Sequence, residues 1–319
     1  MREAVTRGDE LLEILELQPE QVNYCASAAA DFRIKVPRSF VARMRKGDPD
    51  DPLLRQVLAQ QLELQETTGF TTDPVGECGN ANPQAGVIHK YHGRALLIVT
   101  GACAVHCRYC FRRHFPYEDN SAGHSQWQQA LDYLRGDTSI SEVILSGGDP
   151  LVAGDVQLAS LVGELAEVAH IRRLRIHSRV PVVLPERVTE ALLQAITHPK
   201  LHTVMVVHSN HANEIDAGVI EAVAALRSYN VLTLNQAVLL AGINDNLASQ
   251  LALSETLFGA GILPYYLHLL DRVVGAAHFE VEEQQAVALH RQMTTQLPGY
   301  LVPKLVREIE GAAAKVAIG

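Results

Sequence analysis

The sequence predicts an α/β fold in which helices alternate with parallel strands and the sheet curls into a partial (β/α)6 barrel. From about residue 94 onward, six short segments rich in Val, Ile or Leu recur about 30 residues apart, the size of a βα unit. They are largely apolar on both faces, as is typical of parallel strands that helices cover. Right-handed crossovers between such units bring the carboxyl ends of the strands to one face, where active-site residues are expected.

The predicted elements follow one another in regular order. The expected strands are Ala95–Thr100, Glu142–Leu145, Leu174–His177, Thr203–His208, Val231–Gln236 and Leu263–Leu267. The helices expected between them are Gln126–Arg135, Val156–Val168, Pro185–Ile196, Glu214–Ser228 and Leu247–Gly259.

Residues 1 to about 90 lack this alternation, so three parts are expected. These are an N-terminal helical region and linker (residues 1–90), the partial barrel (residues 91–280), and a short C-terminal part that begins with a helix (residues 281–319). Within the first part, Glu10–Leu17 and Pro52–Leu64 predict helices. Thr67–Gln84, rich in Gly, Pro, Thr and Asn, predicts a linker.

Composition and charge exclude several classes of function. A net charge of −9 disfavours a broad nucleic-acid-binding face, although a local basic cluster occurs at residues 108–114. Apolar runs such as Ala95–Val99 and Ala237–Ile243 are far too short to cross a bilayer. The polar, acidic N-terminus does not have the pattern of a signal peptide. We therefore expect a cytoplasmic protein with no membrane span.

Three cysteines directly follow the first expected strand. Cys103, Cys107 and Cys110 have the spacing C-x3-C-x2-C, and cysteine thiolates are the usual ligands of iron–sulfur clusters. A zinc site completed by His106 or His114 is the alternative, although no second pair of cysteines follows. A disulfide would need an oxidising compartment. The spacing resembles that of radical S-adenosylmethionine (SAM) enzymes, in which a 4Fe–4S cluster leaves one iron open to SAM.

A glycine pair follows the second expected strand. Here the chain reads Ser146-Gly147-Gly148-Asp149, and glycines allow a backbone to approach a ligand closely. A lone Gly-Gly usually marks a turn. One βα unit after the cysteines, however, it resembles the segment that binds the amino group of SAM in radical SAM enzymes, with Asp149 fixing the loop.

Further motifs resemble the lysine 2,3-aminomutase family, and in particular its short branch that modifies elongation factor P. The resemblance covers residues 85–319 and part of the N-terminal region. The motifs that carry it are Tyr91–Cys103, Cys107–Phe115, Ser146–Pro150, His177–Pro185, His208–Ile215, Asn235–Leu240, Pro264–Tyr266 and, for the short branch, Val36–Phe40, Gly47–Leu53 and Tyr300–Leu305.

The resemblance implies pyridoxal 5′-phosphate (PLP) as a further cofactor, bound as a Schiff base. Lys315 stands at the family position of the PLP lysine, although Gly311-Ala-Ala-Ala replaces the family's run of glycines; Lys304 is the alternative. By resemblance, Arg94 binds the PLP phosphate and Tyr91 contacts PLP. Gln236 lies between PLP and SAM, and His208 borders SAM.

The resemblance also assigns the substrate-binding residues. Arg112 matches the arginine that binds the substrate carboxylate. Asp271 and Glu308 match two acids that hold the distal ammonium of lysine, where the family usually has two aspartates. Paired carboxylates suit a cationic side chain.

These residues imply a radical SAM, PLP-dependent isomerase that converts L-α-lysine to (R)-β-lysine for modification of elongation factor P. The implied partners are L-lysine, a one-electron reductant, and elongation factor P or its lysyl-tRNA-synthetase-like ligase, with a homo-oligomer left open. No zinc is expected, because the family's zinc-binding cysteines beyond the barrel are absent from this sequence. An aminomutase acting on glutamate or ornithine, and a non-catalytic iron–sulfur protein, remain the alternatives.

Overall fold

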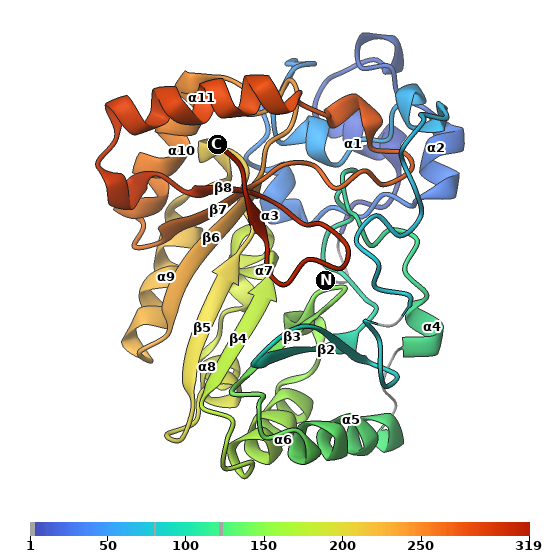
Figure 1. Cartoon of the computed structure of the whole chain (residues 1–319). Coiled ribbons are helices and arrows are strands. Elements are labelled where there is room, and N and C mark those ends of the chain that lie inside the picture. The colour runs from blue at the N-terminus through green and yellow to red at the C-terminus, as the bar shows by residue number, and fades with distance from the viewer. Residues whose placement is uncertain (1–3, 80, 121–123) are drawn as a thin grey trace.

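The computed structural model describes residues 4–79, 81–120 and 124–319. Within these ranges one nine-stranded sheet has the order β1-β2-β3-β4-β5-β6-β7-β8-β9, with each strand beside the next in sequence. Strands β2 to β8 run parallel, whereas β1 and β9 are antiparallel to their neighbours. The sheet is strongly curved and not closed, which confirms the predicted α/β partial barrel (Figure 1).

All six expected strands are present, within a few residues of their expected bounds. The strands are β1 (Val87–Tyr91), β2 (Arg94–Thr100), β3 (Glu142–Gly147), β4 (Arg173–Ser178), β5 (His202–Val207), β6 (Leu232–Val238), β7 (Leu263–His268), β8 (Lys304–Arg307) and β9 (Val316–Ala317).

Strand β8 extends the parallel sheet beyond the expected six strands. Only Leu305 and Val306 are buried apolar residues in this short strand, so it has too little hydrophobic pattern to predict a strand. Its position depends on pairing with β7, where Leu305 lies beside Leu267.

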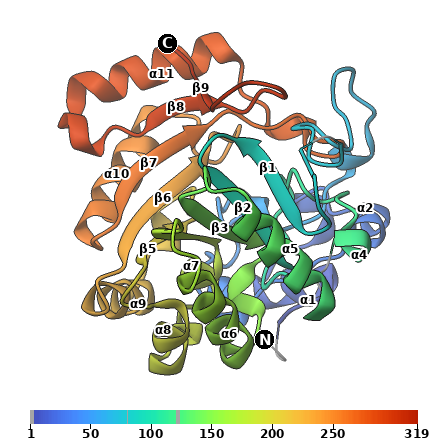
Figure 2. The same ribbon diagram turned by 60° about the horizontal axis from the view of Figure 1, so that its bottom comes forward.

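Helices cover the outer face of the curved sheet, as Figure 2 shows for α5, α6 and α8 to α11. The barrel helices and the C-terminal helix are α4 (Tyr117–Asn120), α5 (His124–Gly136), α6 (Asp155–Ala166), α7 (Val180–Val183), α8 (Glu190–Ile196), α9 (Ala217–Ser228), α10 (Leu247–Gly259) and α11 (Glu283–Gln296). Side-chain caps mark several starts: Thr189, Asp216 and Asn246 accept backbone N–H groups at α8, α9 and α10. In the described part of the chain, no helix is both long and apolar enough to cross a membrane.

The N-terminal region lies at the end of the sheet toward which β4 and β5 point (Figure 1). It contains α1 (Gly8–Ile14), α2 (Ala26–Asp31) and α3 (Arg38–Val41). The helix predicted over Pro52–Leu64 is wrong. Two 3-10 turns, Leu54–Gln56 and Gln61–Leu64, flank a short irregular stretch that ends in the extended residue Gln60.

Tertiary pairing explains this difference. The Ala59 carbonyl accepts a hydrogen bond from the Cys25 amide at 3.1 Å, and Gln60 forms an antiparallel bridge with Tyr24. Backbone N–H and C=O groups that would form hydrogen bonds within a helix thus form them between two segments of the chain. One apolar core runs from Val5 in this region to Leu305 in β8, so the N-terminal region packs on the same core as the barrel.

Candidate active site

A cavity of about 490 Å³ opens at the carboxyl ends of the parallel strands. Every residue that the sequence assigns to a site lines it: Tyr91, Arg94, Cys103, Cys107, Cys110, Arg112, Ser146, Gly147, Gly148, Asp149, His208, Gln236, Asp271, Glu308 and Lys315. Lys304, the alternative PLP lysine, is an exposed residue of β8 and does not line the cavity. Parallel strands bring these residues together although they are spread over more than 200 positions of the sequence.

The cysteine loop leaves the end of β2 and forms one wall of the cavity. Burial, followed by the neighbouring Cys107, raises the pKa of Cys110 to about 11, and burial also raises the pKa of Cys103. A thiolate is therefore costly here unless a cation is bound nearby. Among the described residues, no three His, Cys, Asp or Glu side chains are grouped so as to hold a metal ion. The donor set nevertheless fits a cluster that is several atoms wide and takes one thiolate per iron.

The N-terminal region holds this loop from outside the barrel. The Lys35 ammonium donates to the Cys103 carbonyl at 2.8 Å, and the His106 amide donates to the Lys35 carbonyl at 2.9 Å. The basic cluster is a tertiary anchor rather than a solvated turn. Arg108 is fully buried and pairs with Glu63 at 2.5 Å, and Arg113 also pairs with Glu63, at 3.2 Å.

The Gly147–Gly148 pair lies against the cysteine loop. A Cβ on Gly147 would lie 2.5 Å from the Thr100 carbonyl oxygen, and one on Gly148 would lie 2.5 Å from that of Ala102. Gly147 also has a φ of +123°. The Gly148 amide donates to the Thr100 carbonyl at 2.7 Å, so this amide supports the cysteine loop and is not free for a ligand.

Asp149 fixes the next loop from within. Its carboxylate accepts from the Ser178 hydroxyl at 2.7 Å and from the amides of Arg179 and Val180, at 2.8 and 3.2 Å. Burial raises the pKa of Asp149 to about 6, although these hydrogen bonds oppose the shift. Asp149 therefore joins the end of β3 to the end of β4.

Elsewhere on the cavity wall, Lys315 and Glu308 form an ion pair. Lys315 Nζ lies 2.7 Å from Glu308 Oε2, and Lys90 Nζ lies 2.5 Å from Glu308 Oε1. Burial alone would raise the pKa of Glu308, but the two lysines hold it well below its usual value. Burial, followed by the charge of Glu308, raises the pKa of nearby Asp271 to about 7. The two carboxyl groups therefore differ in their charge. Glu308 is ionised and paired with two lysines, whereas burial brings the pKa of Asp271 to about 7.

Arg112 pairs with a carboxylate that the sequence did not reveal. Its Nε and Nη2 atoms donate to the two oxygens of Glu77 at 2.6 and 2.9 Å, while Nη1 donates to the Ser146 hydroxyl at 2.9 Å. Glu77 is 3% exposed and also lies 3.4 Å from Lys90 Nζ. It belongs to the segment predicted as a linker, where no periodicity marks it. Lys90 could have been suspected, because it directly precedes Tyr91 in the family-like motif.

Two further features fit a PLP group. The Tyr91 hydroxyl is buried and has no hydrogen-bond partner among the described residues, and the Arg94 guanidinium lies 4.6 Å from the Tyr91 ring centroid. The Lys315 ammonium lies inside the cavity, 5.7 Å from the Tyr266 ring centroid. An unpaired hydroxyl, a guanidinium and an amine supply a phosphate site and an imine-forming group.

Three neutral histidines complete the wall. Burial lowers the pKa of His208 to about 3, and lowers those of His177 and His268 well below the usual value. Within the part of the chain that the structure describes, each Nε2 atom is buried without a hydrogen-bond partner. The sequence indicated only His208 as a site residue. His177, on β4, begins the family-like motif His177–Pro185 without a role assigned to it, and His268, on β7, lies outside the family-like motifs.

Comparison with known proteins identifies close relatives. Residues 97–251 match the radical SAM superfamily. The chain is 49% identical over 319 residues to the L-lysine 2,3-aminomutase of Escherichia coli (strain K12), covering 100% of this chain and 93% of that protein. It is 45% identical over 315 residues to that of Haemophilus influenzae, covering 99% and 93%. A radical SAM methyltransferase from Sphaerobacter thermophilus superposes with a TM-score of 0.48 at 14% identity, covering 71% of each chain.

Proposed function

Because this chain belongs to the lysine 2,3-aminomutase family of radical SAM proteins, we propose that it converts L-α-lysine to (R)-β-lysine. The observation that supports this most directly is the shared cavity. The three cysteines line the same cavity as Lys315. The basic side chain of Arg112 and the acidic side chains of Asp271 and Glu308 line it as well. An enzyme that moves the amino group of lysine needs all of these within reach of one substrate molecule.

The cofactors supply the difficult chemistry and this chain supplies position and charge. When bound, the cluster and SAM supply a radical that removes hydrogen from an unactivated C–H bond, and PLP supplies a carbonyl group for the amine. Cys103, Cys107 and Cys110 would hold the cluster, with the Ser146–Asp149 loop beside SAM. Tyr91 and Arg94 would hold the PLP phosphate, and Gln236 and His208 would separate the two organic cofactors.

Lys315 is the residue proposed to anchor PLP. It must lose a proton before its amine can react, and that proton would leave to solvent, because Glu308, 2.7 Å away, is also paired with Lys90 and stays ionised. Once Lys315 no longer carries a charge, Glu308 is left with Lys90 and can turn to a second cation. The ε-ammonium of lysine is that cation in the proposed reaction.

Arg112 and Asp271 would fix the two ends of the substrate. The Arg112 guanidinium would bind the α-carboxylate of the substrate. To do so, it must first release the carboxylate of Glu77. Asp271 has a pKa of about 7, and an incoming ammonium favours its charged form. Substrate binding would therefore complete the ionisation of Asp271.

The decisive experiment is an anaerobic assay of reconstituted enzyme with SAM, PLP, a reductant and L-lysine, L-glutamate or L-ornithine. The β-amino acid product should form from lysine and not from the other two. Cys103→Ala should abolish both product and SAM cleavage, whereas Cys78→Ala, at an exposed cysteine away from the cavity, should leave both intact. Equal conversion of glutamate would favour a different aminomutase. A stable cluster without SAM cleavage would indicate a non-catalytic iron–sulfur protein.

The cellular role is proposed from the short-branch motifs. The product would serve the ligase that modifies elongation factor P, in the cytoplasm, with no role for nucleic acid and with a homo-oligomer left open. Deleting the gene should leave elongation factor P lighter by one β-lysyl group in intact-mass measurements, and free β-lysine should restore the mass.

We also propose that the chain consists of three folding units, divided at about residues 90 and 280.

A further inference from the structure

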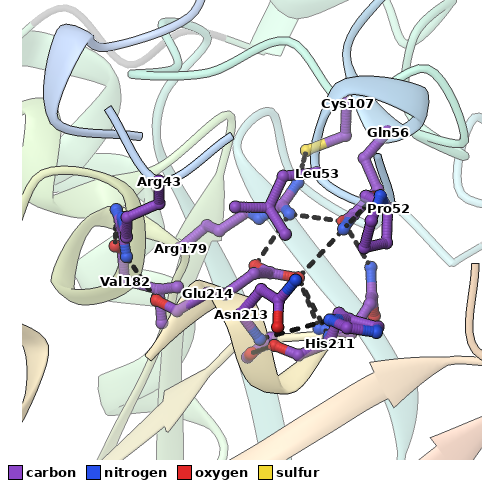
Figure 3. Close-up of polar contacts among 12 residues, drawn as sticks. Arg43, Pro52, Leu53, Gln56, Cys107, Arg179, Val182, His211, Asn213 and Glu214 are labelled. Carbon is purple, nitrogen blue, oxygen red and sulfur yellow. Dashed lines mark hydrogen bonds and ion pairs between the residues drawn. The ribbon is translucent and has the colours of Figure 1, made fainter. Parts of the chain in front are cut away.

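One of the three cluster cysteines has a hydrogen bond to its sulfur. Arg179, directly after β4, donates from Nη1 to the Cys107 sulfur at 2.7 Å. Among the hydrogen bonds of the described residues, Cys103 and Cys110 receive no side-chain donor at sulfur. Figure 3 shows the Arg179 side chain reaching from its backbone between Cys107 and Glu214. The three sulfurs are therefore electrostatically unequal.

The guanidinium is held firmly in this position. Its Nη2 atom donates to Gln56 Oε1 at 2.6 Å and to Glu214 Oε2 at 3.0 Å. Arg179 is 4% exposed and Glu214 is fully buried. The rings of Phe40 and Tyr109 lie 5.3 and 5.7 Å from the guanidinium carbon. Water therefore has little access to this group, and its charge acts on the sulfur with little screening.

The N-terminal region fixes both anchors. The Gln56 amide donates to Glu214 Oε1 at 3.0 Å, and the Gln56 carbonyl accepts from the Arg108 amide in the cysteine loop at 2.9 Å. Arg43, after α3, donates to the backbone carbonyls of Glu214 and Val182 (Figure 3). Gln56, more than 40 positions before the cysteine loop, thus determines where the Arg179 charge lies.

We propose that Arg179 is a positioning residue that tunes the reduction potential of the cluster through the Cys107 sulfur. A donor and a positive charge at a ligating sulfur stabilise the cluster more after it has gained an electron, because its negative charge is then larger. The potential is therefore higher than it would be without Arg179. Glu214 opposes this effect, because its carboxylate neutralises part of the same charge. Gln56 of the N-terminal region holds the side chains of Arg179 and Glu214, so that these two opposing charges stay in place relative to the sulfur.

The test is the midpoint potential of the reconstituted cluster, followed by the electron paramagnetic resonance signal of the reduced form. The double substitution Arg179→Gln with Glu214→Gln removes both charges and leaves no buried ion unpaired. At the wild-type midpoint, its ratio of reduced to oxidised cluster should fall about tenfold, or about 59 mV for one electron. Glu214→Gln alone should shift the ratio the opposite way. Gln56→Met should act in the direction of the double variant but less strongly, because it loosens the guanidinium.

Arg43→Lys is the matched control. It alters an arginine of the same network whose contacts to Val182 and Glu214 are with backbone carbonyls and which does not touch a cysteine. It should keep the wild-type midpoint even if the protein becomes less stable. Opposite shifts in Glu214→Gln and the double variant are the signature of charge at the sulfur. A double variant that binds four irons per chain and keeps the wild-type potential would overturn the proposal. So would equal shifts in Arg43→Lys, which would indicate general loosening of the site.

Discussion

Glu308 pairs with two of the chain's own lysines, and the lysine substrate is proposed as a further partner. It pairs with Lys315 and Lys90 at 2.7 and 2.5 Å, and these cations keep it charged in a buried position. If the lysine substrate were the sole partner of Glu308, this carboxylate would be buried and unpaired before each turnover, at a cost of several kcal/mol. The chain's own lysines avoid this cost.

Lys315→Ala should prevent covalent PLP binding because the imine-forming amine is lost. Lys304→Ala is the control, since Lys304 is exposed and outside the cavity. Borohydride reduction followed by peptide mass mapping should find the pyridoxyl group on Lys315 in the wild type and in Lys304→Ala. A label on Lys304 would contradict the assignment.

Asp271→Asn should raise stability and lower activity. Burial raises the Asp271 pKa from its ordinary 3.8 to about 7. Its contribution to stability is thus greatest below pH 3.8 and is lost as the pH rises through 7. The neutral asparagine should raise the urea unfolding midpoint more at pH 8 than at pH 5.

Lysine turnover should instead fall 30- to 4,000-fold, the equivalent of about 2–5 kcal/mol for an unpaired buried charge. PLP and SAM binding should change much less, because Asp271 is proposed to contact neither cofactor. A stability gain that does not depend on pH would show that the carboxylate is not the cause.

Glu77→Gln should lower the lysine concentration needed for half-maximal turnover. The Glu77 carboxylate occupies two N–H groups of Arg112 that the substrate carboxylate is proposed to use, and a neutral amide competes less well for a guanidinium. Steady-state kinetics with lysine measures this directly. The exposed Glu20→Gln should leave the same constant unchanged, and a higher constant in Glu77→Gln would mean that Glu77 supports Arg112 rather than competing for it.

At the scale of elements, the periodicity of β2 to β7 predicted the parallel sheet, because each of these strands has its own apolar run. Spacing alone indicated the three cysteines, whereas the resemblance to the family indicated most of the other residues around the cavity. Glu77 could not be predicted, because its role depends on an ion pair with Arg112 that local sequence does not encode. Strand β8 and the turns over residues 52–64 depend in the same way on pairing with distant segments.

The contact between the β3 loop and the cysteine loop gives an element-scale prediction. Gly147→Ala places a methyl group 2.5 Å from the Thr100 carbonyl at a φ of +123°, so the cysteine loop must shift. We expect a large loss of bound iron after reconstitution. Gly163→Ala, in α6 with no atom within 4 Å of the added carbon, should keep full iron content and gain about 0.4–1 kcal/mol in stability. Equal iron contents in the two variants would contradict a steric role for Gly147.

For the whole molecule, the important consequence lies at the two edges of the sheet. The sheet order ends at β1 on one side and β9 on the other, yet Lys90 of β1 lies 2.5 Å from Glu308, which directly follows β8. In the described sheet, β1 is therefore linked to the segment between β8 and β9 by side chains and not by a backbone ladder. Unlike a ladder, this ion pair contributes to the contact only while the amine and the carboxylate keep opposite charges. The acid that is proposed to hold the substrate is thus also one of the groups that link β1 to the segment after β8, so a change of its partner during turnover would act on this contact as well.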